Sequence, residues 1–219
     1  TAELSLSSTL RRLTSWNRLF AASARGLGSS AQKGLIGELS LLLEVVNSLG
    51  PAIAVQTWKG PLGSPQDFER GPVGVEVKAT SGAAPNVVRV SSERQLDPTA
   101  ASPLLLWAVL LQPAPAGETL NEWVDRARAA FEVDAAALSD FEYLLSRAGY
   151  LETHRDRYSE KFIVVEKRCY RVLEGFPRID HEWLPEGVGS VRYALSLAAC
   201  EPWRVDTAAM LAAFCPEEN

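Results

Sequence analysis

Two carboxylates and a lysine lie close together in this chain and could form a metal-dependent catalytic site. They are Asp67, Glu76 and Lys78, and the segment between the two acids reads as a β-hairpin that reverses at Gly71-Pro72. If the chain reverses there, Asp67 opposes Glu76, and like charges at directly opposed positions destabilise a hairpin. The same pair suits a hard divalent cation such as Mg²⁺, which binds oxygen ligands and activates water.

The face on which these residues lie depends on the register of the hairpin. Strand alternation puts Lys78 beside Glu76 and turns Val75 and Val77 to the other face, and the Val77 carbonyl could add an oxygen ligand. Pro72 is disfavoured at the second central position of an ordinary two-residue turn unless its peptide bond is cis. A four-residue loop keeps the pairing, whereas a three-residue loop shifts it by one residue. A surface hairpin whose acids pair with nearby cations is the alternative.

A third carboxylate, Glu38, lies on a helix that we predict from Gln32 to Leu49. Helical spacing puts it on the apolar side, next to Leu35 and Leu42. An unpaired buried carboxylate costs on the order of several kcal/mol, so Glu38 needs a metal, a lysine or a water-filled cleft. We expect it to complete the metal shell through water or to hold a second ion. An acid that reaches solvent at the margin of the apolar face is the alternative.

Composition narrows the functions that remain. The 219 residues are 47% hydrophobic and 22% charged, and the net charge of −5 argues against a protein that coats DNA indiscriminately. The longest apolar run, 104–111, is too short to span a bilayer, so we expect no membrane association. The chain has 3 cysteines without zinc-site spacing and only 2 histidines, which argues against structural zinc and is typical of a reduced, cytoplasmic protein.

The predicted fold is a mixed α/β core at residues 1–112 followed by an α+β extension at 118–219. The proline-rich stretch 113–117 reads as the linker between them. For the core, hydrophobic periodicity and the Gly and Pro breaks give the order helix, three strands, short helix and strand, after an amphipathic N-terminal helix. The core elements are expected at 1–25, 32–49, 52–58, 67–78, 87–91, 92–95 and 104–111.

The extension reads as two helices, at 118–131 and 135–148, followed by a basic pair of strands at 157–165 and 168–173. This succession resembles a winged-helix module, in which basic side chains contact phosphates. An α+β extension that packs on the core with solvated charges is the alternative. A last strand is expected at 191–198. The predicted phosphate contacts are Arg155, Arg157, Lys161, Lys167 and Arg168.

The spacing of Asp67 and Glu76-Val77-Lys78, after a helix that carries Glu38, resembles the PD-(D/E)XK nuclease superfamily. The resemblance implies the restriction-endonuclease-like fold, whose helix, three strands, helix and strand match the predicted order. It implies that Asp67 and Glu76 bind Mg²⁺, for which Mn²⁺ can substitute, and that Glu38 contributes. It further implies that Lys78 assists hydrolysis and that Gln95 lies near the scissile phosphate.

Further segments resemble the bacterial PD-(D/E)XK motif proteins that are often encoded in restriction-like phage-defence gene clusters. These segments are Trp58-Lys59-Gly60-Pro61, Phe176-Pro177-Arg178-Ile179 and Val191-Arg192-Tyr193, and the resemblance covers most of the chain. One departure is that Gln66 separates Pro65 from Asp67, where the superfamily's proline usually precedes the acid directly.

The leading hypothesis from the sequence is a Mg²⁺-dependent DNA endonuclease of a bacterial phage-defence system. Its expected partner is DNA, with other subunits of such a system and a second copy of the chain as further candidates. A catalytically silent DNA-binding or scaffold subunit with the same fold is the first alternative. An RNA-directed nuclease is the second, because no base-reading motif is visible.

Overall fold

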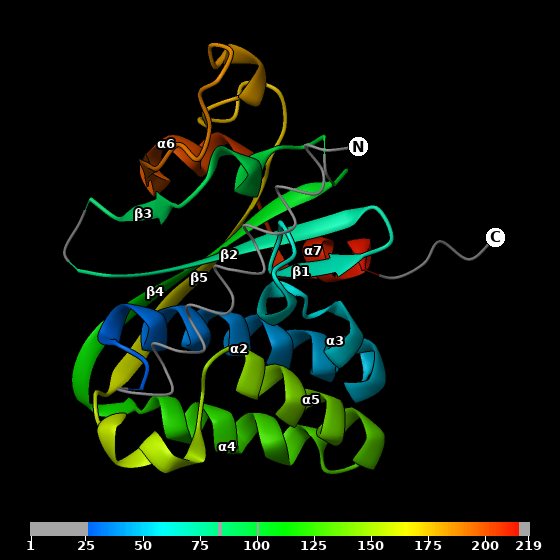
Figure 1. The fold of residues 1–219 in the computed structure, drawn as a ribbon, viewed down its shortest axis with the longest axis vertical. Helices are drawn as coiled ribbons and strands as arrows, with labels where there is room; N and C mark the ends of the chain where they lie inside the picture. The colour runs from blue at the N-terminus through cyan, green and yellow to red at the C-terminus, as the bar shows by residue number, and fades with distance from the viewer. Residues whose placement is uncertain (1–25, 83–84, 100, 215–219) are drawn as a thin grey trace.

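The protein has a mixed α/β fold in layers (Figure 1). A computed structural model describes residues 26–82, 85–99 and 101–214, so the predicted helix at 1–25 lies outside the described residues. A five-stranded sheet in the order β1-β2-β4-β5-β7 separates a layer of helices from a second, two-stranded sheet, β3-β6. Within the described ranges, no helix combines the length and the apolar character needed to cross a membrane.

Among the described elements, α2 is the longest helix. The strands are β1 (Phe68–Arg70), β2 (Val73–Ser81), β3 (Val87–Val90), β4 (Leu104–Glu118), β5 (Phe162–Arg171), β6 (Tyr193–Ser196) and β7 (Arg204–Val205). The α-helices are α2 (Ser29–Leu49), α3 (Pro51–Thr57), α4 (Leu120–Phe131), α5 (Ala135–Arg147), α6 (Leu197–Cys200) and α7 (Thr207–Ala213). The 3₁₀ helices are η1 (Gly60–Leu62), η2 (Glu93–Leu96), η3 (Glu152–Arg157), η4 (His181–Trp183) and η5 (Glu201–Trp203).

The main sheet is centred on β4, which runs parallel to β2 and antiparallel to β5. Residues 104–111 of β4 are all buried, as expected for a strand covered on both faces. On the far side of β2, β1 pairs only with Val73, Gly74 and Val75. The second half of β2 therefore has an open edge within the described residues.

Helix α2 covers one face of the sheet and packs closely on β2. Its buried residues join Val75 and Val77 in the larger hydrophobic core, and α4 and α5 lie on the outer side of α2 (Figure 1). The close approach requires a glycine, because a Cβ on Gly37 would lie 3.2 Å from the Ala79 Cβ and 3.3 Å from the Val77 Cγ1. Residues Ala79 and Val77 thus fix the distance between α2 and the strand that carries the predicted site.

A second, smaller core lies on the other face of the sheet, under β3 and β6. Val88 and Val90 are buried while Val87 and Arg89 are exposed, which is the alternation of a strand with one solvated face. The predicted strand at 87–91 is therefore present, but it pairs with β6 and not with the main sheet. The chain then returns through η2, which contains Gln95, over the face of β2 that carries Glu76.

The prediction of a strand at 52–58 is wrong, because this segment forms helix α3. Its β-branched residues favoured a strand, but Pro51 occupies the first helical turn and Gly50 precedes it with φ +82°. The buried residues Ala54, Val55 and Trp58 lie at helical spacing, so tertiary packing decides the local structure.

The predicted linker at 113–117 is also wrong, because β4 continues through it to Glu118. Gly117 lies against the backbone of Phe162 so closely that a Cβ would be 2.4 Å from the Phe162 carbonyl carbon. The prolines fall where the register with β5 is irregular, which removes the need for their missing N–H groups. Elements on both sides of the 112/118 boundary consequently share one sheet and one hydrophobic core.

The predicted winged-helix module is not formed. Both of its helices are present as α4 and α5, but the predicted basic strand pair is a single strand, β5, that extends the main sheet. The charged residues between the two predicted strands continue β5, and Lys167 and Arg168 each form ion pairs with neighbouring elements. The alternative, an extension packed on the core, describes the observed arrangement.

We expect substitution of Gly37 by valine to destabilise the protein by about 1–3 kcal/mol, because the new side chain forces α2 away from β2. The same substitution at Gly34 is the matched control, since a Cβ there has nothing within 4 Å. Urea unfolding followed by circular dichroism measures both free energies of unfolding. Equal values for the two variants would contradict the close contact between α2 and β2.

Candidate active site

The hairpin that carries the acids has the predicted register. Phe68 pairs with Val75 and Arg70 with Val73, which leaves a two-residue loop of Gly71-Pro72. The one cis peptide bond among the described residues lies elsewhere in the chain, so Pro72 follows a trans bond. Gly71 has φ +58°, as the first central residue of a type II′ turn requires, and the negative φ of proline fits the second position. The mirror-image turn thus accommodates Pro72.

This register brings Asp67 next to Glu76, and the backbone fixes the Asp67 carboxylate on the open edge of β2. The amide of Val77 donates a hydrogen bond of 2.8 Å to Asp67 Oδ2. In a strand, the N–H and C=O groups of one residue point to the same side, so the Val77 carbonyl also faces the Asp67 side. The predicted oxygen ligands therefore face the same edge.

Glu76 is the most constrained of these groups. Its side chain is 1% exposed, Lys78 Nζ lies 2.5 Å from its Oε1, and its Oε2 has no hydrogen-bond partner among the described residues. Burial raises the pKa of Glu76 well above its ordinary value, and the charge of Asp67 raises it further. Lys78 opposes this shift, while the more weakly coupled Glu38 adds to it. The site thus concentrates negative charge that the lysine only partly balances.

Lys78 is held between strand β2 and η2. Its Nζ donates to Gln95 Oε1 at 3.0 Å as well as to Glu76, and its side chain is 13% exposed. Gln95 Oε1 also accepts from the amide of Ser91 at 2.8 Å. This oxygen accepts both hydrogen bonds, so the Gln95 Nε2 group can donate to other acceptors. The structure therefore places Gln95 in contact with Lys78.

Glu38 approaches the pair from helix α2. It is partly exposed, and its Oε2 accepts a hydrogen bond of 2.8 Å from Trp58 Nε1. A Cβ on Gly60 would lie 2.8 Å from Asp67 Oδ1 and 3.2 Å from Glu38 Oε2, so both acids border this glycine. The amide of Gly60 also donates to the Asp67 carbonyl at 2.8 Å.

Sequence reasoning did not assign a role in the site to Trp58 or Gly60. In the sequence, the Trp58-Lys59-Gly60-Pro61 run supports only the resemblance to the family. The signal that could have identified these residues is the combination of an indole N–H donor and a glycine in a segment directly before the hairpin. In the structure the Trp58 indole donates a hydrogen bond to Glu38. Gly60 has no side chain and so leaves space for the carboxylates of Glu38 and Asp67.

The donor set fits a small divalent ion held by few protein ligands. Within the described ranges, no group of three or more His, Cys, Asp or Glu side chains is close enough to hold a metal ion. Mg²⁺ does not need such a group, because it usually binds one or two carboxylates and keeps several waters. The partnerless Oε2 of Glu76, the Asp67 carboxylate and the Val77 carbonyl would hold it, with Glu38 acting through water.

Three of the five basic residues predicted to contact phosphates form ion pairs within the protein. Arg155 pairs with Asp125, Lys167 with Glu44 and Arg168 with Glu166. Each of these three ion pairs contains a basic residue that we predicted to contact a DNA phosphate. The two remaining residues, Arg157 and Lys161, are exposed.

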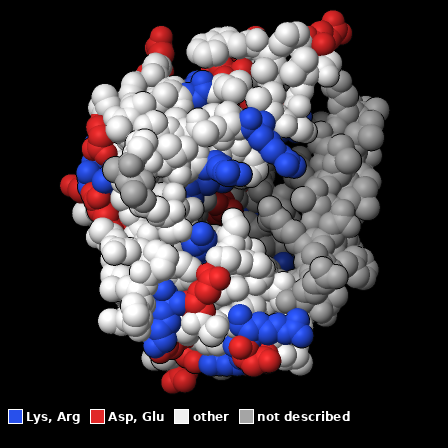
Figure 2. Space-filling model, turned by 90° about the vertical axis from the view of Figure 1, so that its left-hand side faces the viewer, with Lys and Arg blue, Asp and Glu red and all other residues white. Residues whose placement is uncertain are grey.

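Figure 2 shows where charge gathers on one face of the molecule. A hollow in this face contains acidic atoms, and Lys and Arg side chains lie around it. Such an arrangement allows a polyanion to approach through a basic rim toward an acidic interior, where a cation is needed to balance the charge.

Comparison with known families agrees with this geometry. A family model described as "Putative PD-(D/E)XK family member, (DUF4420)" matches residues 1–198. The chain belongs to the DUF4420 family. This membership confirms the predicted resemblance to PD-(D/E)XK proteins, and the mixed sheet with α2 against β2 is consistent with that fold. No curated protein and no solved structure gives a significant match to this DUF4420 member.

We expect the stability of the metal-free protein to depend on pH through Glu76. Because the folded-state pKa lies above the ordinary value of 4.5, the native state binds more protons than the unfolded state above that pH. The free energy of unfolding attributable to Glu76 therefore falls as pH rises from 4.5 through the raised pKa.

Urea unfolding of wild type and Glu76→Gln between pH 4 and 8, with chelator present, measures this dependence. The variant should gain stability relative to wild type as pH rises, whereas Glu69→Gln, a partly exposed acid of the same hairpin, should follow wild type. A constant difference between wild type and Glu76→Gln across the pH range would be incompatible with the raised pKa.

Proposed function

We propose that this DUF4420 protein is a Mg²⁺-dependent endonuclease that hydrolyses phosphodiester bonds in DNA. The observation that carries the proposal is the convergence of Asp67, Glu76 and Lys78 at the open edge of β2, where one buried oxygen of Glu76 has no hydrogen-bond partner among the described residues. A structural ion pair needs one acid and one base, and the second acid raises its cost. Family membership supports the nuclease assignment independently.

Each residue has a role that follows from its position. Bound between Asp67 and Glu76, the metal ion would lower the pKa of a water and neutralise charge on the scissile phosphate. Lys78 forms an ion pair with Glu76 and can stabilise the negative charge that develops on a phosphoryl oxygen. Gln95 fixes the position of Lys78 through its Oε1, and its Nε2 is a further donor toward the phosphate.

The open edge of β2 gives DNA access to these groups. Because β1 ends at the level of Val75, nothing among the described strands pairs with β2 on the side of Asp67 beyond that point. Of the predicted phosphate contacts, we retain Arg157 and Lys161, which are exposed. The other three cations stabilise the fold through ion pairs.

The biological setting is part of the same proposal. The sequence resembles PD-(D/E)XK proteins encoded with bacterial phage-defence genes, and we propose that this protein cleaves invading DNA in the cytoplasm. Other subunits of such a system are candidate partners. This assignment is supported by the sequence resemblance and not by a contact in the structure.

We expect wild-type protein to cleave plasmid DNA in Mg²⁺ or Mn²⁺, and Asp67→Ala and Lys78→Ala each to reduce the rate by about 10²-fold or more, because each removes charge stabilisation in the transition state. Agarose-gel time courses under single-turnover conditions measure the rates. The matched control is Glu69→Ala, which removes a carboxylate from the same hairpin outside the site. Cleavage that survives both site substitutions would refute the assignment, and a labelled RNA in parallel tests the RNA-directed alternative.

A catalytically silent DNA-binding subunit is the second candidate. The observation that favours it is the ion pair of Lys78 with Glu76, together with the lack of a three-ligand cluster among the described side chains. Such a subunit would bind DNA equally well with and without Mg²⁺ and would not cut it.

Thermal denaturation separates these two candidates. For the nuclease, we expect Mg²⁺ to stabilise wild type by about 2.7 kcal/mol at a concentration 100 times its dissociation constant, because only the folded state has the site. The Asp67→Ala variant should show no such shift, and Glu69→Ala should behave as wild type. No Mg²⁺-dependent shift in wild type, with DNA binding retained, would favour the silent subunit.

A further inference from the structure

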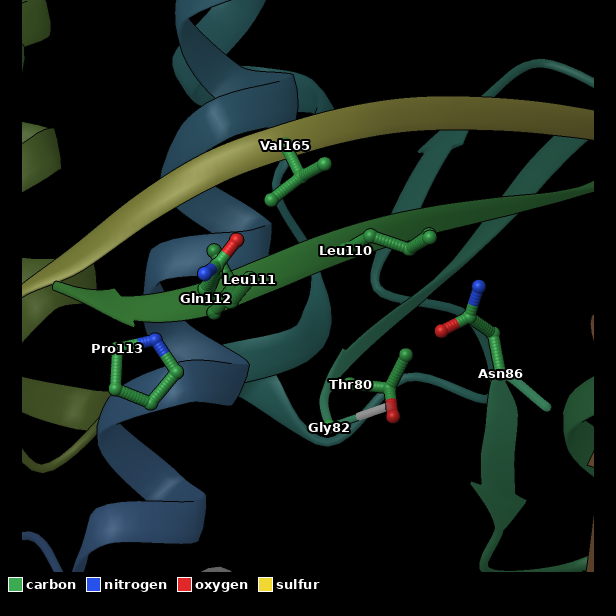
Figure 3. Close-up of a pocket in the computed structure, with 8 residues that line it drawn as sticks. All are labelled: Thr80, Gly82, Asn86, Leu110, Leu111, Gln112, Pro113 and Val165. Atoms are coloured by element: carbon green, nitrogen blue, oxygen red, sulfur yellow. The ribbon is translucent and has the colours of Figure 1, made fainter. Parts of the chain in front are cut away.

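A pocket of about 620 Å³ lies beside the candidate active site, at the end of β2 where the chain turns toward β3 (Figure 3). Its walls come from β2, from β4 and β5, and from the segment that leads into β3. Its volume is typical of pockets that bind small organic groups. Its lining includes Thr80, Asn86, Leu110, Gln112, Pro113 and Val165.

The pocket begins two residues beyond Lys78 along β2. Side chains of alternate residues share one face of a strand, so Thr80 follows Glu76 and Lys78 on the same face of β2. Adjacent members of this row are about 7 Å apart along the strand. On β4, Ala108 pairs with Lys78 and Leu110 pairs with Thr80. Thr80 and Leu110 therefore begin the pocket wall two residues beyond Lys78 along β2.

A β-bulge in β5 accompanies the pocket. Leu110 pairs with Glu166 and Leu111 with Val164, which leaves Val165 without a partner on β4. Bulges change the direction of a side chain and are common next to active sites. Val165 lines the pocket and is 58% exposed, so it contributes little to the core.

The chemistry of the lining favours an uncharged, flat group with hydrogen-bonding edges. Leu110, Pro113 and Val165 supply apolar surface, and no charged side chain lines the pocket among the described residues. In Figure 3 the amides of Asn86 and Gln112 lie on opposite sides of Thr80 and Leu110. No side-chain hydrogen bond of either amide occurs in the described part of the chain, so both can bind an edge that presents donors and acceptors.

A second, smaller pocket extends the same path. It has a volume of about 380 Å³, shares Pro113 with the first pocket and is lined by Lys161. A strand that enters at Lys78 and passes Thr80 would reach this exposed cation after the first pocket. In a nucleic acid strand each sugar, with its base attached, lies between two phosphates, and here an uncharged pocket lies between two cations.

We propose that the first pocket binds one unstacked nucleobase of the DNA strand whose phosphate lies at Lys78. The inference rests on the proposed function, because the nuclease site fixes where the phosphate lies. A nucleobase combines a flat apolar face with a polar edge, which the aliphatic side chains and the two amides complement. A phosphate fits this pocket poorly, because no cation lines it.

The experiment compares two single-stranded probes of equal length and charge, oligothymidylate and an abasic phosphodiester chain, by fluorescence anisotropy in chelator. Wild type should bind oligothymidylate roughly tenfold more tightly, since stacking one base contributes on that order. Val165→Trp fills the pocket and should reduce this ratio toward one. Ile163→Trp is the matched control, because Ile163 is 42% exposed on the same strand and does not line the pocket.

A second variant controls for the possibility that Val165→Trp changes the structure of β5. Gln112→Ala removes an exposed amide without a described hydrogen bond, so it should leave folding unchanged and lower the same ratio. Equal affinities of wild type for both probes, or a wild-type ratio that persists in Val165→Trp and Gln112→Ala, would overturn the proposal. Because binding is measured without metal, a wild type that discriminates the probes but cleaves no DNA would refute the nuclease assignment while supporting the base pocket.

Discussion

The burial of the Glu76 carboxylate is the constraint on which the rest of the site depends. Taking a charge out of water costs several kcal/mol even after relaxation, on the order of the net stability of a whole domain. Lys78 balances one oxygen, while the neighbouring Asp67 adds a second negative charge. The arrangement persists because the surrounding elements leave these side chains no other position. A cation at this point would satisfy the remaining oxygen and remove the repulsion.

The surrounding elements hold β2 between two hydrophobic cores. Val75 and Val77 pack under α2, and the close approach at Gly37 prevents β2 from shifting toward the helix. On the opposite face the smaller core covers β4 and places η2 above Lys78. The row of Glu76, Lys78 and Thr80 is therefore a polar stripe in an otherwise apolar setting.

The sequence predicted the fold class and the register of the hairpin but misassigned several surrounding elements, and the reason is physical. The hairpin register follows from strand alternation around Gly71-Pro72, which are local properties of the chain. By contrast, Pro51 and the burial of Ala54, Val55 and Trp58 make 52–57 helical, and this depends on packing against distant elements. The extension of β4 through Gly117 likewise depends on the contact with Phe162, which no local pattern reveals. Periodicity identifies which residues share a face, but not which element covers that face.

The open edge links the stability of the fold to its proposed chemistry. An exposed strand edge presents unpaired N–H and C=O groups and invites association with other chains, unless charged side chains or short partner strands block it. Here β1 ends after three residues, and the Asp67 carboxylate caps the Val77 amide just beyond the paired segment. The Asp67 carboxylate thus accepts the hydrogen bond of the Val77 amide at this edge, and the Val77 carbonyl faces the same side. Extending β1 by two more pairs, to Gln66 opposite Val77, would replace this cap with a ladder bond and cover the carbonyl, so the short strand is a requirement of the site.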